Sequence, residues 1–314
     1  MKVLGIDTSN YATSAAVFDS ERGEIVVSAT IPLEVKKGSL GLRQSDAVFA
    51  HTKNIPGLFE RLAEKTSLRD ICAVGVSDRP RDSEGSYMPC FLAGVSAASA
   101  VSRVLDVPLC TFSHQAGHVM AALYGTGFSR ETRKDFYAFH VSGGTTDLMS
   151  CTLDAGTLNI ETAATSLDLL AGQVVDRVGA KLGLDFPAGE ELSKLASDSD
   201  IKDHAKPVLK GLDCCLSGLE NQCAKLIDDN NNPAYVARYC LNSIAEVIAE
   251  MARRVAVGID SDATDLIFAG GVMSSNIIRD IIVKRFKNAH FCDSTLSCDN
   301  AVGTAILASI FKSL

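Results

Sequence analysis

The sequence lacks a long unbroken apolar run, and it has no Cys-x-x-Cys pair among its ten cysteines. Its longest weakly polar stretch, residues 90–110, is interrupted by Arg103 and Asp106, and so falls short of the roughly 20 apolar residues that a membrane helix needs. An acid as early as Asp7 argues against an export signal. In a chain of this kind, scattered cysteines indicate buried thiols in a reducing compartment. We therefore expect a soluble, cytoplasmic protein.

The chain also lacks an excess of positive charge. Its 30 Lys and Arg residues are outnumbered by 38 Asp and Glu residues, for a net charge of −8. That balance argues against a surface that is cationic throughout and coats nucleic acid, but it leaves room for a local basic patch. The apolar share of 46% is enough for a large core, and 314 residues allow about two domains of the usual ~150 residues.

Three segments share a pattern of strand, small-residue turn and a new element. Strands are expected at residues 3–9 and 13–18, and again at 137–141 and 147–153 on either side of a turn rich in Gly, Ser and Thr. The third segment is a strand at 265–269, followed by Gly270-Gly271 and a helix at about 274–287. Two similar hairpins about 135 residues apart favour a duplicated α/β lobe.

In the remaining segments, apolar residues recur at the spacing of a helix. Pro56 should kink or restart the first of these helices, and residues 201–215 are the least regular part of the chain. The expected helices cover residues 46–65, 91–105, 233–257 and 300–314.

Two histidines follow the expected strand at residues 109–112. If a helix begins there, His114 and His118 stand at positions i and i+4 on one face, where both imidazoles can reach one metal ion. Two half-buried histidines at a helix start are the commoner meaning of such a short motif. Asp299, just before the last helix, is either a third ligand or an N-cap. Two histidines and a carboxylate would suit iron or zinc and leave positions open for substrate.

Two glycine-containing turns present backbone N–H groups to an anion. Residues 142–146 offer such groups after a strand, and Gly270-Gly271 offers them before a helix. Either turn alone is weak evidence, because glycine pairs more often mark ordinary tight turns, and neither matches a Walker A or a Gly-x-Gly-x-x-Gly motif. Together with a metal site in a duplicated α/β frame, they indicate a nucleotide or phosphoester ligand, with Gly271 as one contact.

The order and spacing of these motifs resemble the actin-like ATPase superfamily, and within it the tRNA threonylcarbamoyladenosine transferase family, formerly called the glycoprotease or O-sialoglycoprotein endopeptidase family. The resemblance runs nearly end to end. It implies an α/β protein of two duplicated actin-like, ribonuclease H-like lobes with a nucleotide and metal cleft between them. The lobes would be residues 1–112 plus 299–314, and residues 113–298. The matching motifs are Gly5-Ile6-Asp7, His114-x-x-Gly117-His118, Ser142-Gly143-Gly144, Leu167-Asp168, Gly172 with Asp176, Gly183-Leu184, Ser217-Gly218-Leu219, Gly270-Gly271-Val272 and Asp299-Asn300.

The resemblance also implies a set of site residues. The metal ligands would be His114, His118 and Asp299. The family's asparagine after the last Gly-Gly-Val falls on Ser275, with Asn276 one place later as a substitute. The nucleotide and acyl donor would lie against Val141, Ser142, Gly143, Gly144, Asp176 and Gly189.

Several acids of the family pattern are absent, as in a diverged paralogue. A charged stretch at residues 78–89 replaces the family's short Gly-Pro-Gly turn. Asp7 is the surviving acid at the first turn and the nearest candidate for a catalytic proton carrier, with hydrogen bonding within the turn as an equally good interpretation. The family's other acidic or basic positions carry Asn10, Tyr11 and Ala12 at the first turn, Ala116 between the histidines, Gln173, and Glu220.

The leading hypothesis is a metal-dependent tRNA N6-adenosine threonylcarbamoyltransferase or a close paralogue. The donor would be threonylcarbamoyl-adenylate, the acceptor a tRNA adenosine, and the cofactor one divalent iron or zinc ion. A tRNA modification complex would supply partner proteins, and no membrane is involved. The rivals are an actin-like-fold ATPase or carbamoyl-type transferase with another acceptor, and a non-catalytic partner that binds nucleotide or metal within such a complex.

Overall fold

The computed structural model describes residues 1–9, 11–34, 42–124, 134–154, 156–256, 264–291 and 300–311. The chain divides into two compact units. The first comprises Met1–Lys134, Thr152–Ile160 and Asp293–Leu314, and the second comprises Asp135–Cys151 and Glu161–Cys292.

The first unit is built on a five-stranded mixed sheet within the described residues. β1, β4 and β5 run parallel, whereas β2 is antiparallel to both β1 and β3. Asp7 of β1 stands opposite Ser14 of β2, and Gly5 stands opposite Gly75 of β4. In spatial order the strands are β3 (Glu24–Pro32), β2 (Ala12–Asp19), β1 (Lys2–Ser9), β4 (Ile71–Arg79) and β5 (Leu109–Ser113).

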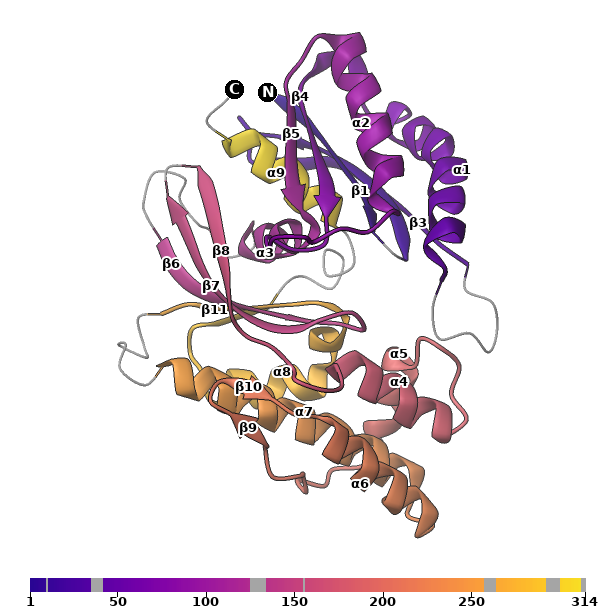
Figure 1. Cartoon of the computed structure of the whole chain (residues 1–314), viewed down its shortest axis with the longest axis vertical. Coiled ribbons are helices and arrows are strands. Elements are labelled where there is room, and N and C mark those ends of the chain that lie inside the picture. The colour runs from indigo at the N-terminus through magenta and orange to yellow at the C-terminus, as the bar shows by residue number, and fades with distance from the viewer. Residues whose placement is uncertain are drawn as a thin grey trace. The chain divides into compact units, whose positions relative to one another are not determined.

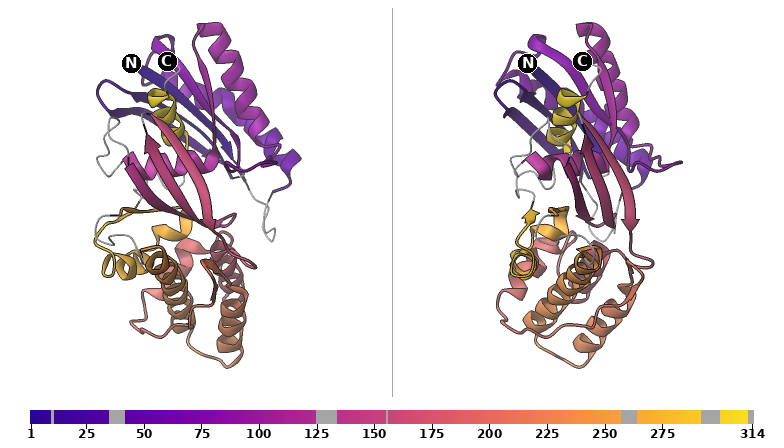
Figure 2. Two further views of the ribbon diagram at one scale, coloured as in Figure 1. Left: turned by 60° about the vertical axis from the view of Figure 1, so that its left-hand side comes forward. Right: turned by 90° about the vertical axis from the view of Figure 1, so that its left-hand side faces the viewer.

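Alternation along β1 sends successive side chains to opposite faces of this sheet. Leu4 and Ile6 pack into the core under α1 (Gln44–Ala63) and α2 (Phe91–Leu105). Val3 shares a cluster with Ala308 of α9 (Asn300–Ile310), and Gly5 lies against the α9 backbone. The sheet is therefore covered by α1 and α2 on one face and by α9 on the other (Figure 1, Figure 2). Asp7 lies in phase with Val3 and Gly5, on the α9 side.

The helix α3 (His114–Tyr124) follows β5 without a loop and packs against α9. A Cβ on Gly303 of α9 would collide with the carbonyl oxygen of Gly117, so glycine is required at this crossing. From the sequence we expected the lobe boundary after residue 112. In the structure α3 belongs to the first unit, where it packs against α9.

The second sheet repeats the strand order of the first. β6 takes the central place of β1, β7 and β8 follow on one side, and β11 and β12 run parallel to β6 on the other. This repetition is the duplication that the two hairpins indicated. The strands, in spatial order, are β12 (Ala289–Phe291), β11 (Leu266–Ala269), β6 (Lys134–Val141), β7 (Thr146–Asp154) and β8 (Thr157–Ala164).

Helices and a small hairpin complete the second unit (Figure 1). Its core is centred on the stacked rings of Phe139 and Phe268, whose centroids are 4.9 Å apart. The hairpin β9 (Leu209–Lys210) and β10 (Asp213–Cys214) lies in the stretch expected to be least regular. The helices are α4 (Ala171–Lys181), α5 (Gly189–Ala196), α6 (Ser217–Asp228), α7 (Pro233–Ala256) and α8 (Asn276–Val283), and the 3-10 turns are Leu68–Asp70 in the first unit and Gly271–Ser274 in the second.

Two expectations about helices need correction. α1 continues through Pro56 without restarting. α8 ends at Val283 rather than near residue 287, and a 3-10 turn precedes it in place of its expected first residues. None of the helices in the described part of the chain is long and apolar enough to span a membrane.

Candidate functional site

The carboxyl ends of three parallel strands bring polar side chains together in the first unit. β1 ends with Asp7–Ser9, β4 ends with Ser77–Arg79, and β5 ends at Ser113, immediately before His114. Carboxyl ends of parallel strands are the usual place for ligands in α/β folds. The structure therefore brings two sequence-predicted site residues, Asp7 and His114, to the same edge of the first sheet.

A direct hydrogen bond joins the side chains of Asp7 and His114. The distance from Asp7 Oδ2 to His114 Nδ1 is 2.9 Å, and the backbone N–H of Ser9 donates to Asp7 Oδ1 at 2.9 Å. Burial alone would raise the pKa of Asp7, but the imidazole of His114 and hydrogen bonds from Ser77 and Ser9 outweigh it and hold this pKa at about 2. Asp7 is therefore an ionised acceptor at neutral pH, so Nδ1 of His114 carries the proton that it donates to Asp7.

His114 and His118 lie together as the spacing predicted. α3 begins at His114, and the centroids of the two rings are 4.7 Å apart with an interplanar angle of 76°. His118 is buried, and the centroid of the Phe91 ring lies 5.9 Å from that of the His114 ring. Ser113 caps the helix, since its hydroxyl accepts the backbone N–H of Ala116 at 3.0 Å.

This donor set fits a divalent metal ion. A carboxylate that binds one nitrogen of a metal-ligating histidine, fixing its tautomer and ring orientation, is a recurring feature of metal sites. Asp7 does this for His114 and leaves Nε2 as the basic nitrogen. Within the described residues, no three His, Cys, Asp or Glu side chains are grouped around one metal position. Asp299, the expected third ligand, lies outside the described residues.

The charged stretch at residues 78–89 is tied to the start of α3. Ser113 Oγ donates to Asp82 Oδ2 at 2.7 Å, and the N–H of Gln115 donates to the carbonyl of Pro80 at 3.1 Å. Arg79 bridges Asp78 and Asp82 at 2.6 and 2.5 Å. These hydrogen bonds therefore hold the segment that replaces the family's short Gly-Pro-Gly turn beside His114.

The second unit holds the residues expected to contact a nucleotide. β6 ends at Val141, and Ser142–Thr145 form a tight turn in which the Ser142 N–H donates to the Thr145 carbonyl at 2.8 Å. A Cβ at Gly143 or Gly144 would meet no described atom within 4 Å, so that side of the turn is open. A Cβ on Gly172 of α4, in contrast, would lie 2.5 Å from Gly143 N. The start of α4 therefore packs on the turn.

Gly270 and Val141 join the last glycine pair to this turn. Gly270 has a φ of +97°, and a Cβ there would lie 2.8 Å from the carbonyl carbon of Val141. Gly271 is open on its Cβ side among the described atoms. Ser275 precedes α8, and its buried hydroxyl has no hydrogen-bond partner in the described residues, while Asn276 is the first residue of α8. A buried hydroxyl in this state, at a helix start, is suited to a ligand oxygen.

Asp176 and Gly189 lie further along α4 and at the start of α5. Burial raises the pKa of Asp176, and the N–H of Ala188, just before Gly189, donates to its Oδ1 at 2.9 Å and opposes that rise. The structure thus brings the sequence-predicted nucleotide residues into two neighbouring groups, one around Val141–Gly144 and Gly270, the other around Asp176 and Gly189.

Two departures from the family pattern have structural partners. Gln173 Oε1 accepts the N–H of Leu170 at 3.3 Å and so helps to begin α4. Glu220, where the family has lysine, forms an ion pair of 3.1 Å with Lys181. Of the first-turn residues, Tyr11 is exposed and Asn10 lies outside the described residues.

His51 of α1 was not singled out from the sequence. It is fully buried, its Nδ1 lies 2.9 Å from Thr13 Oγ1, and its Nε2 has no hydrogen-bond partner in the described part of the chain. Burial lowers its pKa, and the charge of Asp7 opposes this shift. The available signal was a single histidine on the apolar face of an amphipathic helix, which by itself indicates only a core position.

A sequence model described as tRNA N6-adenosine threonylcarbamoyltransferase matches residues 28–306 of this chain. A curated protein with that name from Nanoarchaeum equitans is 27% identical over 300 residues, covering 95% of this chain and 88% of the relative.

Solved structures of several other proteins share the fold. Full-length HypF, in a phosphate- and nucleotide-bound form, gives a TM-score of 0.62 at 12% identity, over 98% of this chain and 46% of HypF. The activator of 2-hydroxyisocaproyl-CoA dehydratase from Clostridium difficile, with bound ADPNP, gives 0.53 at 15% identity, over 98% of this chain and 94% of the activator. At these identities the likeness concerns the fold alone, and it confirms the expected actin-like ATPase fold. Because the family match spans most of its length, the chain belongs to the tRNA N6-adenosine threonylcarbamoyltransferase family.

Proposed function

We propose that this protein transfers a threonylcarbamoyl group from threonylcarbamoyl-adenylate to the N6 amine of a tRNA adenosine. The observation that carries the proposal is the Asp7–His114 bond beside His118, within a chain of this transferase family. Two imidazoles on one helical turn, with one oriented by a buried carboxylate, are suited to hold a metal ion. His114, His118 and Asp299 would be its ligands, and iron or zinc would suit them.

The metal ion would supply Lewis-acid polarisation and orientation of the donor. Asp7 acts through His114, because its low pKa makes it a poor general base at neutral pH and both of its oxygens are engaged. We therefore assign Asp7 an orienting role and not the proton-carrying role that its position in the first turn first indicated.

The second unit would bind the adenylate part of the donor. No described atom lies within 4 Å of the place that a Cβ would take at Gly143, Gly144 or Gly271, so an anion could approach the backbone there. Backbone N–H groups that meet a leaving phosphate would stabilise its developing charge. The Ser275 hydroxyl would donate to a ligand oxygen. Burial disfavours the charged form of Asp176 and raises its pKa, and acids with a pKa perturbed in this way are common in binding sites.

A second candidate is a partner protein that binds nucleotide or metal but transfers nothing. The observation in its favour is the first turn, where Tyr11 and Ala12 replace the acids of the family pattern. The structural partners of Gln173 and Glu220 weigh against it, because they give these two departures a structural role, in the start of α4 and in an ion pair with Lys181.

A transfer assay separates the two candidates. Purified protein is incubated with an unmodified tRNA transcript, threonylcarbamoyl-adenylate and iron or zinc, and the nucleosides are then quantified by mass spectrometry. A parallel reaction contains cell extract that supplies partner proteins but is depleted of its own transferase. Modified adenosine from the parent, and none from a His114→Ala/His118→Ala variant, supports transfer. No product in either reaction, with nucleotide binding intact, overturns transfer in favour of the binding partner.

A further inference from the structure

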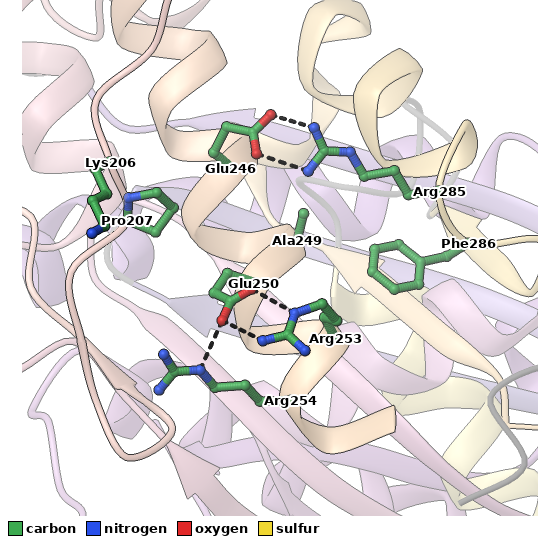
Figure 3. Close-up of a pocket in the computed structure, with 9 residues that line it drawn as sticks. All are labelled: Lys206, Pro207, Glu246, Ala249, Glu250, Arg253, Arg254, Arg285 and Phe286. Carbon is green, nitrogen blue, oxygen red and sulfur yellow. Dashed lines mark hydrogen bonds and ion pairs between the residues drawn. The ribbon is translucent and has the colours of Figure 1, made fainter. Parts of the chain in front are cut away.

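A cationic cavity on the second unit is lined by none of the candidate site residues. It has a volume of about 530 Å³ and lies along the last turns of α7, next to residues 206–207 and to the residues that follow α8 (Figure 3). Its charged lining residues are Lys206, Glu246, Glu250, Arg253, Arg254 and Arg285. Four cations and two acids leave an excess of two positive charges in a protein whose net charge is −8.

The two glutamates hold the three arginines in place. Arg285 binds both oxygens of Glu246, and Arg253 binds both oxygens of Glu250 at 2.7 Å (Figure 3). Arg254 Nε donates to Glu250 at 2.9 Å, and its other end donates to the carbonyl of Gly211. Bidentate pairs of this kind fix a guanidinium in one orientation.

The cations lie nearer to solvent than the acids that hold them. The side chains of Glu246 and Glu250 are 15% and 24% exposed, whereas those of Arg285 and Arg253 are 45% and 59% exposed. Lys206 is exposed and forms no ion pair with the described residues. Each arginine has N–H groups beyond those used in its ion pair. An approaching ligand therefore meets preoriented cations first.

The arrangement fits the phosphates of a nucleic acid backbone better than a single small anion. The cations come from three separate chain segments around a cavity far larger than one phosphate group. Lys284 and Lys287 flank Arg285 in sequence and are exposed, which extends the positive charge beyond the cavity. Arg and Lys contacts to successive phosphates position a nucleic acid without reading its sequence.

We propose that this cavity binds backbone phosphates of the tRNA substrate, on the second unit and outside the residues that carry the chemistry. The identity of the RNA rests on the proposed function. A local basic surface of this kind overcomes the repulsion that an overall negative charge imposes on a polyanion.

The test uses a Lys206→Gln/Arg253→Gln variant. These changes leave the Arg285–Glu246 and Arg254–Glu250 pairs intact, so neither glutamate loses all its partners. A matched control, Lys53→Gln/Arg61→Gln, removes the same charge from exposed positions on α1 in the first unit. Circular dichroism and thermal unfolding check that both variants fold like the parent.

Binding of fluorescent tRNA transcript is measured at several salt concentrations from about 50 to 200 mM. We expect the dissociation constant of the cavity variant to rise on the order of tenfold, and its salt slope to fall by about two, as for the loss of two phosphate contacts. The control should match the parent. No binding by the parent, or equal affinity and slope in parent and cavity variant, overturns the proposal. The proposal is also overturned if the cavity variant loses only the binding of free AMP and keeps the tRNA binding of the parent.

The outcome is separable from that of the transfer reaction. If the parent modifies tRNA and the cavity variant does so with unchanged KM, this inference fails and the proposed function stands. If tRNA binding falls in the cavity variant but the parent transfers nothing, the RNA surface stands and the proposed function fails.

Discussion

The carboxylate of Asp7 lies 2.9 Å from Nδ1 of His114, across 107 residues of sequence. It is buried, ionised and bonded to the first histidine of α3, whose second histidine lies one turn away. This contact links the end of the first strand to the proposed metal site.

Asp7→Asn should weaken metal binding and transfer. The amide keeps the shape of the side chain but loses the charge that orients His114, and loss of such a partner typically costs about 10- to 100-fold in metal affinity or activity. Metal affinity by competition with a chelator and transfer kcat are the measurements. Asp70→Asn, at an exposed site on the same unit, serves as the control. Equal metal affinity in parent and Asp7→Asn would contradict the orienting role.

Ser113→Ala should destabilise the start of α3. The Ser113 hydroxyl accepts the N–H of Ala116 and donates to Asp82, so its loss removes a helix cap, at a cost of about 1 kcal/mol. Ser113→Thr keeps the hydroxyl and should retain most of the stability. Urea unfolding of the three proteins is the measurement. A Ser113→Ala protein as stable as the parent would show that the cap contributes nothing.

Gly5→Ala should destabilise the first unit, and Gly57→Ala should stabilise it. A Cβ on Gly5 would collide with the α9 backbone at Ala301 and lie 2.6 Å from Ala305 N, which predicts a loss of about 1–3 kcal/mol or more. Gly57 lies within α1, where a Cβ meets no described atom within 4 Å, so alanine should gain about 0.5–1 kcal/mol. Opposite signs in thermal unfolding are expected, and a Gly5→Ala protein at least as stable as the parent would contradict the packing of α9 on β1.

Much of this architecture could be predicted from the sequence, because its signals are local. The apolar runs of β1, β6 and β11 are bounded by small residues, and the start of α3 follows from His114 succeeding a strand. The bonds from Asp7 to His114 and from Asp82 to Ser113 could not be predicted, since they join residues far apart in the chain. β8 also gave no signal, because only Ala164 of this edge strand is buried and the strand is placed by its pairing with β7.

Asp176→Asn should stabilise the protein at neutral pH. Burial raises the pKa of Asp176 in the folded state. Between the pKa of Asp176 in the unfolded chain and its higher pKa in the folded protein, the folded protein binds more protons than the unfolded chain. The free energy of unfolding therefore falls as the pH rises through this range. The amide removes this cost and still accepts the N–H of Ala188. Urea unfolding at about pH 7.5 and 4.5 should show a gain that is larger at the higher pH. Exposed Asp198→Asn is the control, and a gain independent of pH would contradict this explanation.

The proposed function requires that the histidine pair on α3 holds the metal ion that transfer needs. The most direct test is elemental metal analysis of the purified protein beside the His114→Ala/His118→Ala variant, each also after reconstitution with iron or zinc. The predicted result is one equivalent of iron or zinc in the parent and none in the variant. A parent that binds no metal after reconstitution, or a variant that binds as much as the parent, would contradict it.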